Sequence, residues 1–167
     1  MREVLGYAGQ ALFYAVVVAV IGYFSSAPAY QQVPPGLAQI KLSFRHGGER
    51  VEDCRKLTQD ELQALPANER RPNTCSRERV PVVVALILDG KPLYSAVLPP
   101  SGLAGDGPSE TYVKFLVPAG HHALEARLRD SKREEGYDYE KVADIDLVPH
   151  QSLAVDFKAD QGGFLLR

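Results

Sequence analysis

Hydrophobic and polar residues divide the chain at about residue 24. Residues 4–24 hold no charged side chain, and Gln10 is their only strongly polar one. A helix of this length spans the roughly 30 Å hydrocarbon core of a bilayer. Further along, short apolar or alternating segments are separated by Gly, Pro, Asn and Asp, which is typical of strands and turns. The pattern predicts one N-terminal transmembrane helix followed by a β domain.

The β domain begins with residues 38–45, which alternate so that Ile40, Leu42 and Phe44 share one face. The continuous apolar run of residues 80–88 predicts a strand covered on both faces, and the Asp89-Gly90 pair after it is a type I′ hairpin signal. Further strands are expected at residues 93–98, 110–117, 121–129, 137–148 and 153–157, with a short apolar segment at 164–166. These strands predict an all-β sandwich of about seven strands.

Two neighbouring strands carry opposite charges on their outer positions. In residues 137–148 the odd positions are mostly apolar and the even ones, such as Asp144 and Asp146, are mostly acidic. Arg127 and Arg129 alternate in the same way on the preceding strand. Paired as a hairpin, the two strands would set acids against arginines on a solvated face. A glycosidase-like carboxylate pair is disfavoured, because residues two apart on one exposed strand face solvent rather than a cleft.

Two late segments carry a family resemblance. They are residues 117–124, VPAGHHAL, and residues 147–151, LVPHQ, with the strand that follows. These segments resemble the late strands of immunoglobulin-like and transthyretin-like extracytoplasmic domains. The resemblance implies an immunoglobulin-like β-sandwich, here with one short helix, and it carries no functional residues.

Residues 1–24 are expected to be the membrane anchor, residues 25–36 a stiff Pro-rich linker, and residues 37–167 an extracytoplasmic domain. A cleaved signal peptide, with its cleavage site at residues 27–29, is the alternative. Arg2 precedes the helix, and no Lys or Arg follows it until Lys41. The positive-inside rule therefore predicts a single-pass protein of the bacterial inner membrane, with a cytoplasmic N-terminus and a periplasmic domain.

One face of the predicted helix carries small residues. They recur every three or four positions and are Ala11, Ala15, Ala19 and Gly22. Small residues let two membrane helices approach closely, so this face is a candidate helix-packing interface. The alternative is that Ala and Gly are simply common in membrane helices.

Cys54 and Cys75 are the only cysteines. Export would place them in an oxidising compartment, so a structural disulfide is expected. A metal or redox role is disfavoured, because there is no CxxC spacing and no nearby His. Between the cysteines, Thr58 and Glu61 have the spacing of a capping box, which predicts a short helix over residues 59–65.

Composition and charge remove several function classes. The net charge of −2 argues against a nucleic-acid binder, which needs an excess of Lys and Arg. No GxSxG, HExxH or Cys–His arrangement is present, so we expect no enzyme activity. His121 and His122 alternate to opposite faces of a strand and so cannot bind one ion together. No metal, cofactor or small-molecule substrate is predicted.

Two segments are candidate partner-contacting loops. One is the basic cluster around Cys75, which suits an acidic partner or lipid headgroups, with a solvated surface as the alternative. The other is the Gly-rich segment 101–107, which lacks the Lys-Ser/Thr ending of a phosphate loop and has a flexible hairpin loop as its alternative. The candidate contact residues are Arg70, Arg71, Arg77, Ser101, Gly102, Gly105, Asp106 and Gly107.

Placement suggests the function. A small exported domain on one helix, without a catalytic constellation, suits a protein whose partner is already in the membrane. We expect a non-catalytic accessory or assembly subunit of a larger integral membrane complex, with respiratory or other electron-transfer complexes as the first class to consider. The alternatives are a membrane-tethered binding module for a glycan or a metal ion and, if the helix is cleaved, a secreted domain.

Overall fold

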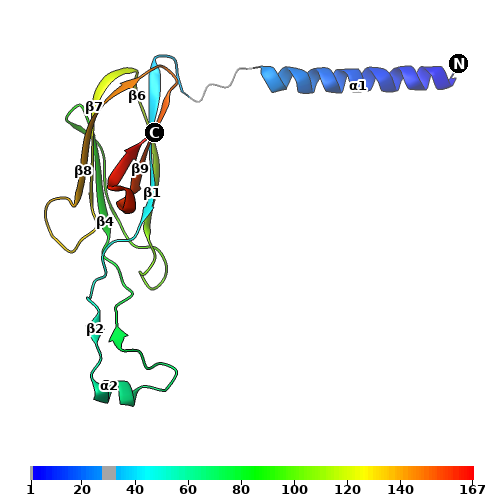
Figure 1. Ribbon diagram of the computed structural model, residues 1–167. Coiled ribbons are helices and arrows are strands. Elements are labelled where there is room, and N and C mark those ends of the chain that lie inside the picture. The colour runs from blue at the N-terminus through cyan, green and yellow to red at the C-terminus, as the bar shows by residue number, and fades with distance from the viewer. Residues whose placement is uncertain (1, 28–32) are drawn as a thin grey trace. The chain divides into compact units, whose positions relative to one another are not determined.

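The computed structural model describes residues 2–27 and 33–167, which fall into two units, a long helix and a β domain (Figure 1). The helix α1 covers Arg2–Ser26. Its stretch Gly6–Ser26 is long and apolar enough to cross a membrane, as an anchor or a signal sequence would be. Residues 28–32 of the predicted linker, with part of the alternative cleavage site, lie outside the described residues.

The domain is mostly β, with one short α-helix. Its elements are β1 (Leu37–His46), β2 (Arg55–Lys56), α2 (Gln59–Ala64), β3 (Asn73–Thr74), β4 (Val82–Leu88), β5 (Lys91–Leu98), β6 (Ser109–Pro118), β7 (Gly120–Arg129), β8 (Tyr139–Leu147), β9 (Ser152–Lys158), the 3₁₀ turn η1 (Ala159–Gln161) and β10 (Gly163–Leu166). The strands lie close to the predicted ranges, because alternation and turn residues mark them locally.

Two four-stranded sheets face each other across one hydrophobic core. One has the strand order β10-β9-β1-β6 and the other β5-β4-β7-β8. Figure 1 shows them as two layers, with β1 and β9 in one and β4, β7 and β8 in the other. Leu42, Val155, Leu86 and Leu128 come from both sheets and are fully buried. Burial of these side chains is the main force holding the sheets together.

The pairing of β1 differs from immunoglobulin connectivity. In immunoglobulin constant domains the first strand lies beside the second in one sheet. Here β1 pairs antiparallel with β6 and parallel with β9, while β4, the next long strand, belongs to the other sheet. The strand order therefore does not follow the immunoglobulin pattern that the resemblance implied.

The predicted β4–β5 turn is formed, and the outer face of β7 and β8 follows the predicted charge pattern in part. Asp89 and Gly90 have φ of 51° and 74°, as a type I′ turn requires, and they join β4 to β5. On the outer face of β7 and β8, Arg127 lies opposite Glu140 as expected. The acidic row is shorter than predicted, because Asp138 precedes β8 and accepts hydrogen bonds from the amides of the preceding turn.

Candidate functional site: the disulfide arm and its base

The most unusual part of the domain is the segment between β1 and β4, residues 49–79, which we call the arm. β1 begins at Leu37, directly after the linker, and ends at His46, just before the arm. The linker and the arm therefore join the domain at opposite ends of this strand. No residue of the arm is buried. Figure 1 shows it extending from the two sheets, with α2 at its tip. The arm therefore has no hydrophobic core of its own.

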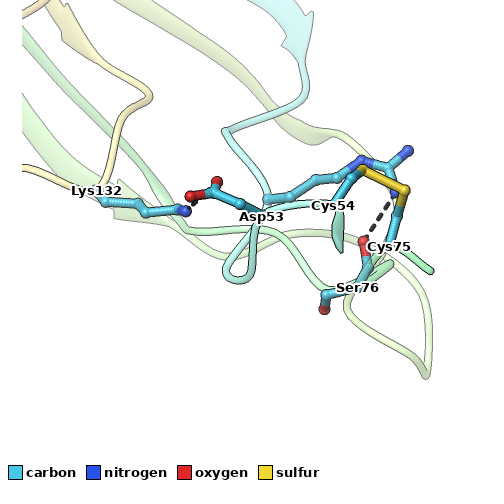
Figure 2. Close-up of a disulfide and its surroundings, with 6 residues drawn as sticks. Asp53, Cys54, Cys75, Ser76 and Lys132 are labelled. Atoms are coloured by element: carbon cyan, nitrogen blue, oxygen red, sulfur yellow. Dashed lines mark hydrogen bonds and ion pairs between the residues drawn. A yellow bond between two sulfur atoms is a disulfide. The ribbon is translucent and has the colours of Figure 1, made fainter. Parts of the chain in front are cut away.

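A disulfide closes the arm. Cys54 and Cys75 are bonded, as the sequence predicts, and they directly adjoin the ribbon of β2 and β3 (Figure 2). In that ribbon Arg55 lies opposite Thr74. The guanidinium of Arg50 adds a hydrogen bond of 2.8 Å to the carbonyl of Ser76. The covalent bond and the ribbon hold the two sides of the arm together without apolar packing.

At the tip, the predicted capping box is formed. The amide of Glu61 donates to the Thr58 hydroxyl, and the Glu61 carboxylate accepts from the Thr58 amide at 2.8 Å. Arg55 donates two hydrogen bonds to the same carboxylate. The Arg55 contact and the Thr58 donors lower the pKa of Glu61 to about 2. The helix ends at Ala64, one residue earlier than predicted.

Arg70 has a local role that the sequence prediction missed. Its Nε donates to the carbonyl of Leu65 at 3.0 Å, and its Nη2 points to the carbonyl of Gln63 at 3.4 Å. These carbonyls lie at the C-terminal end of α2, where backbone acceptors have no partner within the helix. Arg70 therefore helps to end α2. Both Arg70 and the neighbouring Arg71 are exposed.

The base of the arm is bonded to the Gly-rich loop of residues 101–107. The guanidinium of Arg79 donates to the carbonyls of Gly48 and Asp106, at 2.8 and 3.1 Å. Its amide donates to the carbonyl of Gly105. Arg77 pairs with the Asp106 carboxylate at 2.6 Å. The structure thus brings the two candidate loops together at one end of the domain.

The 101–107 loop has a compact conformation of its own. The amide of Gly107 donates to the carbonyl of Ser101 at 2.9 Å, and the amide of Gly105 donates to the carbonyl of Gly102. A Cβ at residue 107 would lie 2.3 Å from the Ser101 hydroxyl oxygen, so only glycine fits there. Leu103, at the tip of the loop, is fully exposed. Backbone hydrogen bonds therefore hold this loop in a conformation that exposes the apolar side chain of Leu103.

A second set of contacts joins the arm to the turn between β7 and β8. The ammonium of Lys132 lies 2.7 Å from the Asp53 carboxylate, as Figure 2 shows. The amide of Lys132 donates to the Glu49 carboxylate, and the amide of Glu49 donates to the carbonyl of Asp130. Because Asp53 directly precedes Cys54, this contact holds the arm next to its disulfide. No local sequence signal pointed to Lys132, since residues 53 and 132 are far apart in the chain.

Three histidines each pair with one aspartate. Nε2 of His46 lies 2.6 Å from Asp130, and His121 and His122 pair separately with Asp146 and Asp89. Within residues 2–27 and 33–167, no group of three His, Cys, Asp or Glu side chains is arranged to hold a metal ion. The lack of a metal, of a cofactor and of enzyme activity stays a prediction.

The predicted helix-packing face belongs to α1. Ala11, Ala15 and Ala19 are exposed there, and a Cβ added at Gly22 would meet no side chain or other segment within 4 Å. The packing role of this face stays a prediction. No family model, curated protein or solved structure matches the chain.

Proposed function

We propose that the protein is a non-catalytic accessory or assembly subunit of a larger membrane complex, held by α1 and contacting its partner through the arm and the 101–107 loop. Respiratory and other electron-transfer complexes are the first class to test. The observation that carries the proposal is the arm itself, an ordered extension with no buried residue, closed by a disulfide and bonded to a second exposed loop.

The arm is costly to order and contributes no core to the domain. Fixing the backbone of a residue costs about 1–2 kcal/mol, which burial normally offsets. Here the disulfide, the Thr58 capping box and the Arg79 contacts offset part of that cost instead. Local devices of this kind keep an exposed segment in one conformation, so it loses less entropy when a partner binds. The side chains of Arg71, between α2 and β3 in the arm, and of Leu103, in the 101–107 loop, are both exposed on this surface.

The proposed location is the bacterial inner membrane, with the domain in the periplasm. The apolar helix supports an anchor, and the disulfide supports an oxidising compartment. Ala11, Ala15, Ala19 and Gly22 would form the contact with a helix of the partner. Since the strand order departs from the immunoglobulin pattern, the transthyretin-like part of the resemblance is the one we propose for the domain.

The test is a purification of the full chain from its native membrane in mild detergent, followed by mass spectrometry. We expect a multi-helix membrane protein in stoichiometric amount. The double variant Arg71→Glu/Leu103→Asp should bind that partner at least tenfold more weakly, because it puts a negative charge on the arm and on the 101–107 loop without touching a described contact. Lys91→Glu is the matched control, since Lys91 is exposed at the start of β5, at the end of the domain opposite the arm.

Three results would contradict the proposal. The first is recovery of the wild-type chain alone, which would favour the tethered binding module. The second is equal loss of the partner in the Lys91→Glu control, which would show that surface charge in general is responsible. The third is a mature protein that begins after residue 29, because cleavage would leave no anchor.

A further inference from the structure

The outer face of the β10-β9-β1-β6 sheet concentrates positive charge. Alternation along each strand places one set of side chains in the core and the other on this face. The outward positions carry five basic residues and two acidic ones, in a chain whose net charge is −2. The basic residues, which define what we call the basic face, are Lys41, Arg45, Lys114, Lys158 and Arg167, and the acidic ones are Glu110 and Asp156.

The basic face carries more positive than negative charge, and only Arg45 lies opposite an acid, Glu110, in the sheet register. Lys41 on β1 lies directly opposite Lys114 on β6 in the sheet register. Like charges at such positions repel, which disfavours the pair in the isolated domain. Among the described residues, none of the five basic side chains makes an ion pair. The one contact of their charged groups is that of Lys114, whose ammonium lies 5.3 Å from the centre of the Tyr112 ring. An external anion would relieve this repulsion.

Apolar and aromatic side chains stand beside these cations. Tyr112 and Leu116 flank Lys114 on the same side of β6 and are 61% and 50% exposed. A tyrosine combines an apolar ring with a polar hydroxyl, and such residues gather where a membrane meets water. The combination of lysines, a tyrosine and a leucine on one flat surface matches the composition of membrane-surface binding segments.

The outer face of the opposite sheet provides a comparison within the same domain. There Arg127 pairs with Glu125 on its own strand and lies opposite Glu140. His121 pairs with Asp146 on the neighbouring strand. The outward positions of β7 and β8 carry more acids than arginines, with Asp144 opposite Ala123, so this face has an excess of negative charge. The two outer faces therefore have opposite sign, and only the basic face would be attracted to an anionic surface.

We infer that the basic face binds the anionic lipid headgroups of the membrane that holds α1. The inference rests on the proposed anchor. About ten residues separate the end of α1 from β1, and a chain of that length reaches at most about 35 Å. With α1 in the membrane, the linker therefore keeps a high local concentration of lipid around the domain. It also joins β1, which is an inner strand of this same sheet.

A lipid surface fits these residues better than a protein does. Three of the five basic residues are lysines, and lysine is depleted in the cores of protein interfaces. A lysine ammonium is attracted to anionic headgroups as a point charge, and this attraction does not require a fixed geometry of the partner. With the sheet on the membrane, the strands run along its surface. The arm, which continues from the end of β1, would then extend sideways over the bilayer.

The test uses the full chain in lipid nanodiscs made of phosphatidylcholine alone or with phosphatidylglycerol. A single cysteine for a fluorophore is placed at Ser43 on the basic face, and in a second protein at Ser95 on the opposite outer face. Both serines are exposed and lie within strands, and the native cysteines are bonded to each other. Quenching by a lipid-borne quencher reports how close each label lies to the membrane.

We expect strong quenching at Ser43 only in discs with phosphatidylglycerol, with a several-fold loss in 0.5 M salt, and weak quenching at Ser95 throughout. The double variant Lys41→Glu/Lys114→Glu should reduce quenching at Ser43 to the level seen with phosphatidylcholine, since each charge near such a surface changes binding about fivefold. Lys91→Glu reverses one charge away from this face and should leave the quenching at Ser43 unchanged, whereas each single variant, Lys41→Glu or Lys114→Glu, should reduce it.

Two results would overturn the inference while leaving the anchor in place. One is similar quenching at Ser43 and Ser95. The other is a signal at Ser43 that ignores lipid charge and salt, which would mean that another surface covers this face. A chain that does not co-elute with the discs would overturn the proposed anchor, and the inference with it.

Discussion

The two sheets and the arm are built from the same chain and are stabilised in opposite ways. In the sheets, Leu42, Leu86 and Leu128 are fully buried in one hydrophobic core. In the arm no residue is buried, and one disulfide, one capping box and a few arginine contacts replace the core. A substitution at any buried position weakens the core that both sheets share. In the arm, the disulfide, the capping box and the arginine contacts can each be removed separately. The two regions should therefore respond differently to the same perturbation.

The largest effect is expected from the core. Leu42→Ala removes a fully buried side chain from the middle of β1 and should lower the free energy of unfolding by about 2–5 kcal/mol. Chemical denaturation of the full chain in detergent, followed by tyrosine fluorescence, measures this loss. Ser43→Ala, at the exposed neighbouring position, should change it by no more than about 0.5 kcal/mol. Equal losses would mean that β1 is not at the centre of the core.

Removing the disulfide should destabilise the arm and leave the sheets unchanged. Cys54→Ser/Cys75→Ser opens a closed loop with a sequence separation of 21, and the chain-entropy estimate for such a loop is about 3 kcal/mol. We expect faster hydrogen exchange in α2 and in the β2–β3 ribbon, with the amides of β4 and β7 unchanged. Mass spectrometry of exchanged peptides distinguishes the two regions. Faster exchange in β4 as well would show that the arm supports the sheets.

Raising the pH should act on the sheets and spare the arm. Nδ1 of His122 lies 2.7 Å from Asp89 and Nε2 lies 2.9 Å from the carbonyl of Pro118, so both ring nitrogens donate only when the ring is protonated. The Asp89 contact raises the pKa of His122 above its ordinary value of 6.5, and the His122 contact lowers the pKa of Asp89. The histidine's contribution is complete below 6.5 and is lost as the pH rises through the raised pKa.

The expected loss between pH 6 and pH 9 is on the order of 1 kcal/mol, the typical net contribution of one hydrogen bond, because Asp89 is about half exposed. Thermal unfolding of the full chain at a series of pH values measures it, and His122→Gln should remove this part of the slope. In the arm, the pKa of Glu61 is lowered to about 2, so its contribution is complete above 4.5 and is lost only as the pH falls towards 2. Exchange in α2 that accelerated between pH 6 and pH 9 beyond its ordinary base catalysis would contradict this division.

The smallest effect is expected from the helix cap. Thr58→Ala removes the hydroxyl that accepts from the Glu61 amide and should destabilise α2 by about 1 kcal/mol. Exchange at residues 59–64 should speed up several-fold, while the sheets stay as they are. Gln59→Ala changes the adjacent exposed side chain and serves as the control. A response in Gln59→Ala as large as that in Thr58→Ala would show that the cap contributes nothing specific.

Local features were predictable from the sequence. The Asp89-Gly90 turn, the Thr58–Glu61 capping box and the alternation of β1 each depend on residues a few positions apart, and each was found where expected. The disulfide was predictable because only two cysteines are present. Both loops of the candidate site were also recognised, but as separate features.

Contacts between distant segments were not predictable. The parallel pairing of β1 with β9 joins the two ends of the domain, and the period-two pattern of a strand does not say which strand lies beside it. The ion pairs Arg77–Asp106 and Asp53–Lys132 could not be predicted either, because the sequence does not say which of its many acidic and basic residues lie close together in the fold. The adjacency of the arm and the 101–107 loop therefore needed the folded structure.

The position of β1 also has a mechanical consequence. Its first residue, Leu37, follows the linker, and its last, His46, leads into the arm, so a pull between the linker and the arm runs along this strand. Such a force shears the hydrogen bonds to β6 and β9 all together instead of opening them one after another. We expect the domain to resist traction in this direction much better than traction applied across β10, the short edge strand. Single-molecule stretching with handles at residues 36 and 71, compared with handles at 162 and 167, measures the difference.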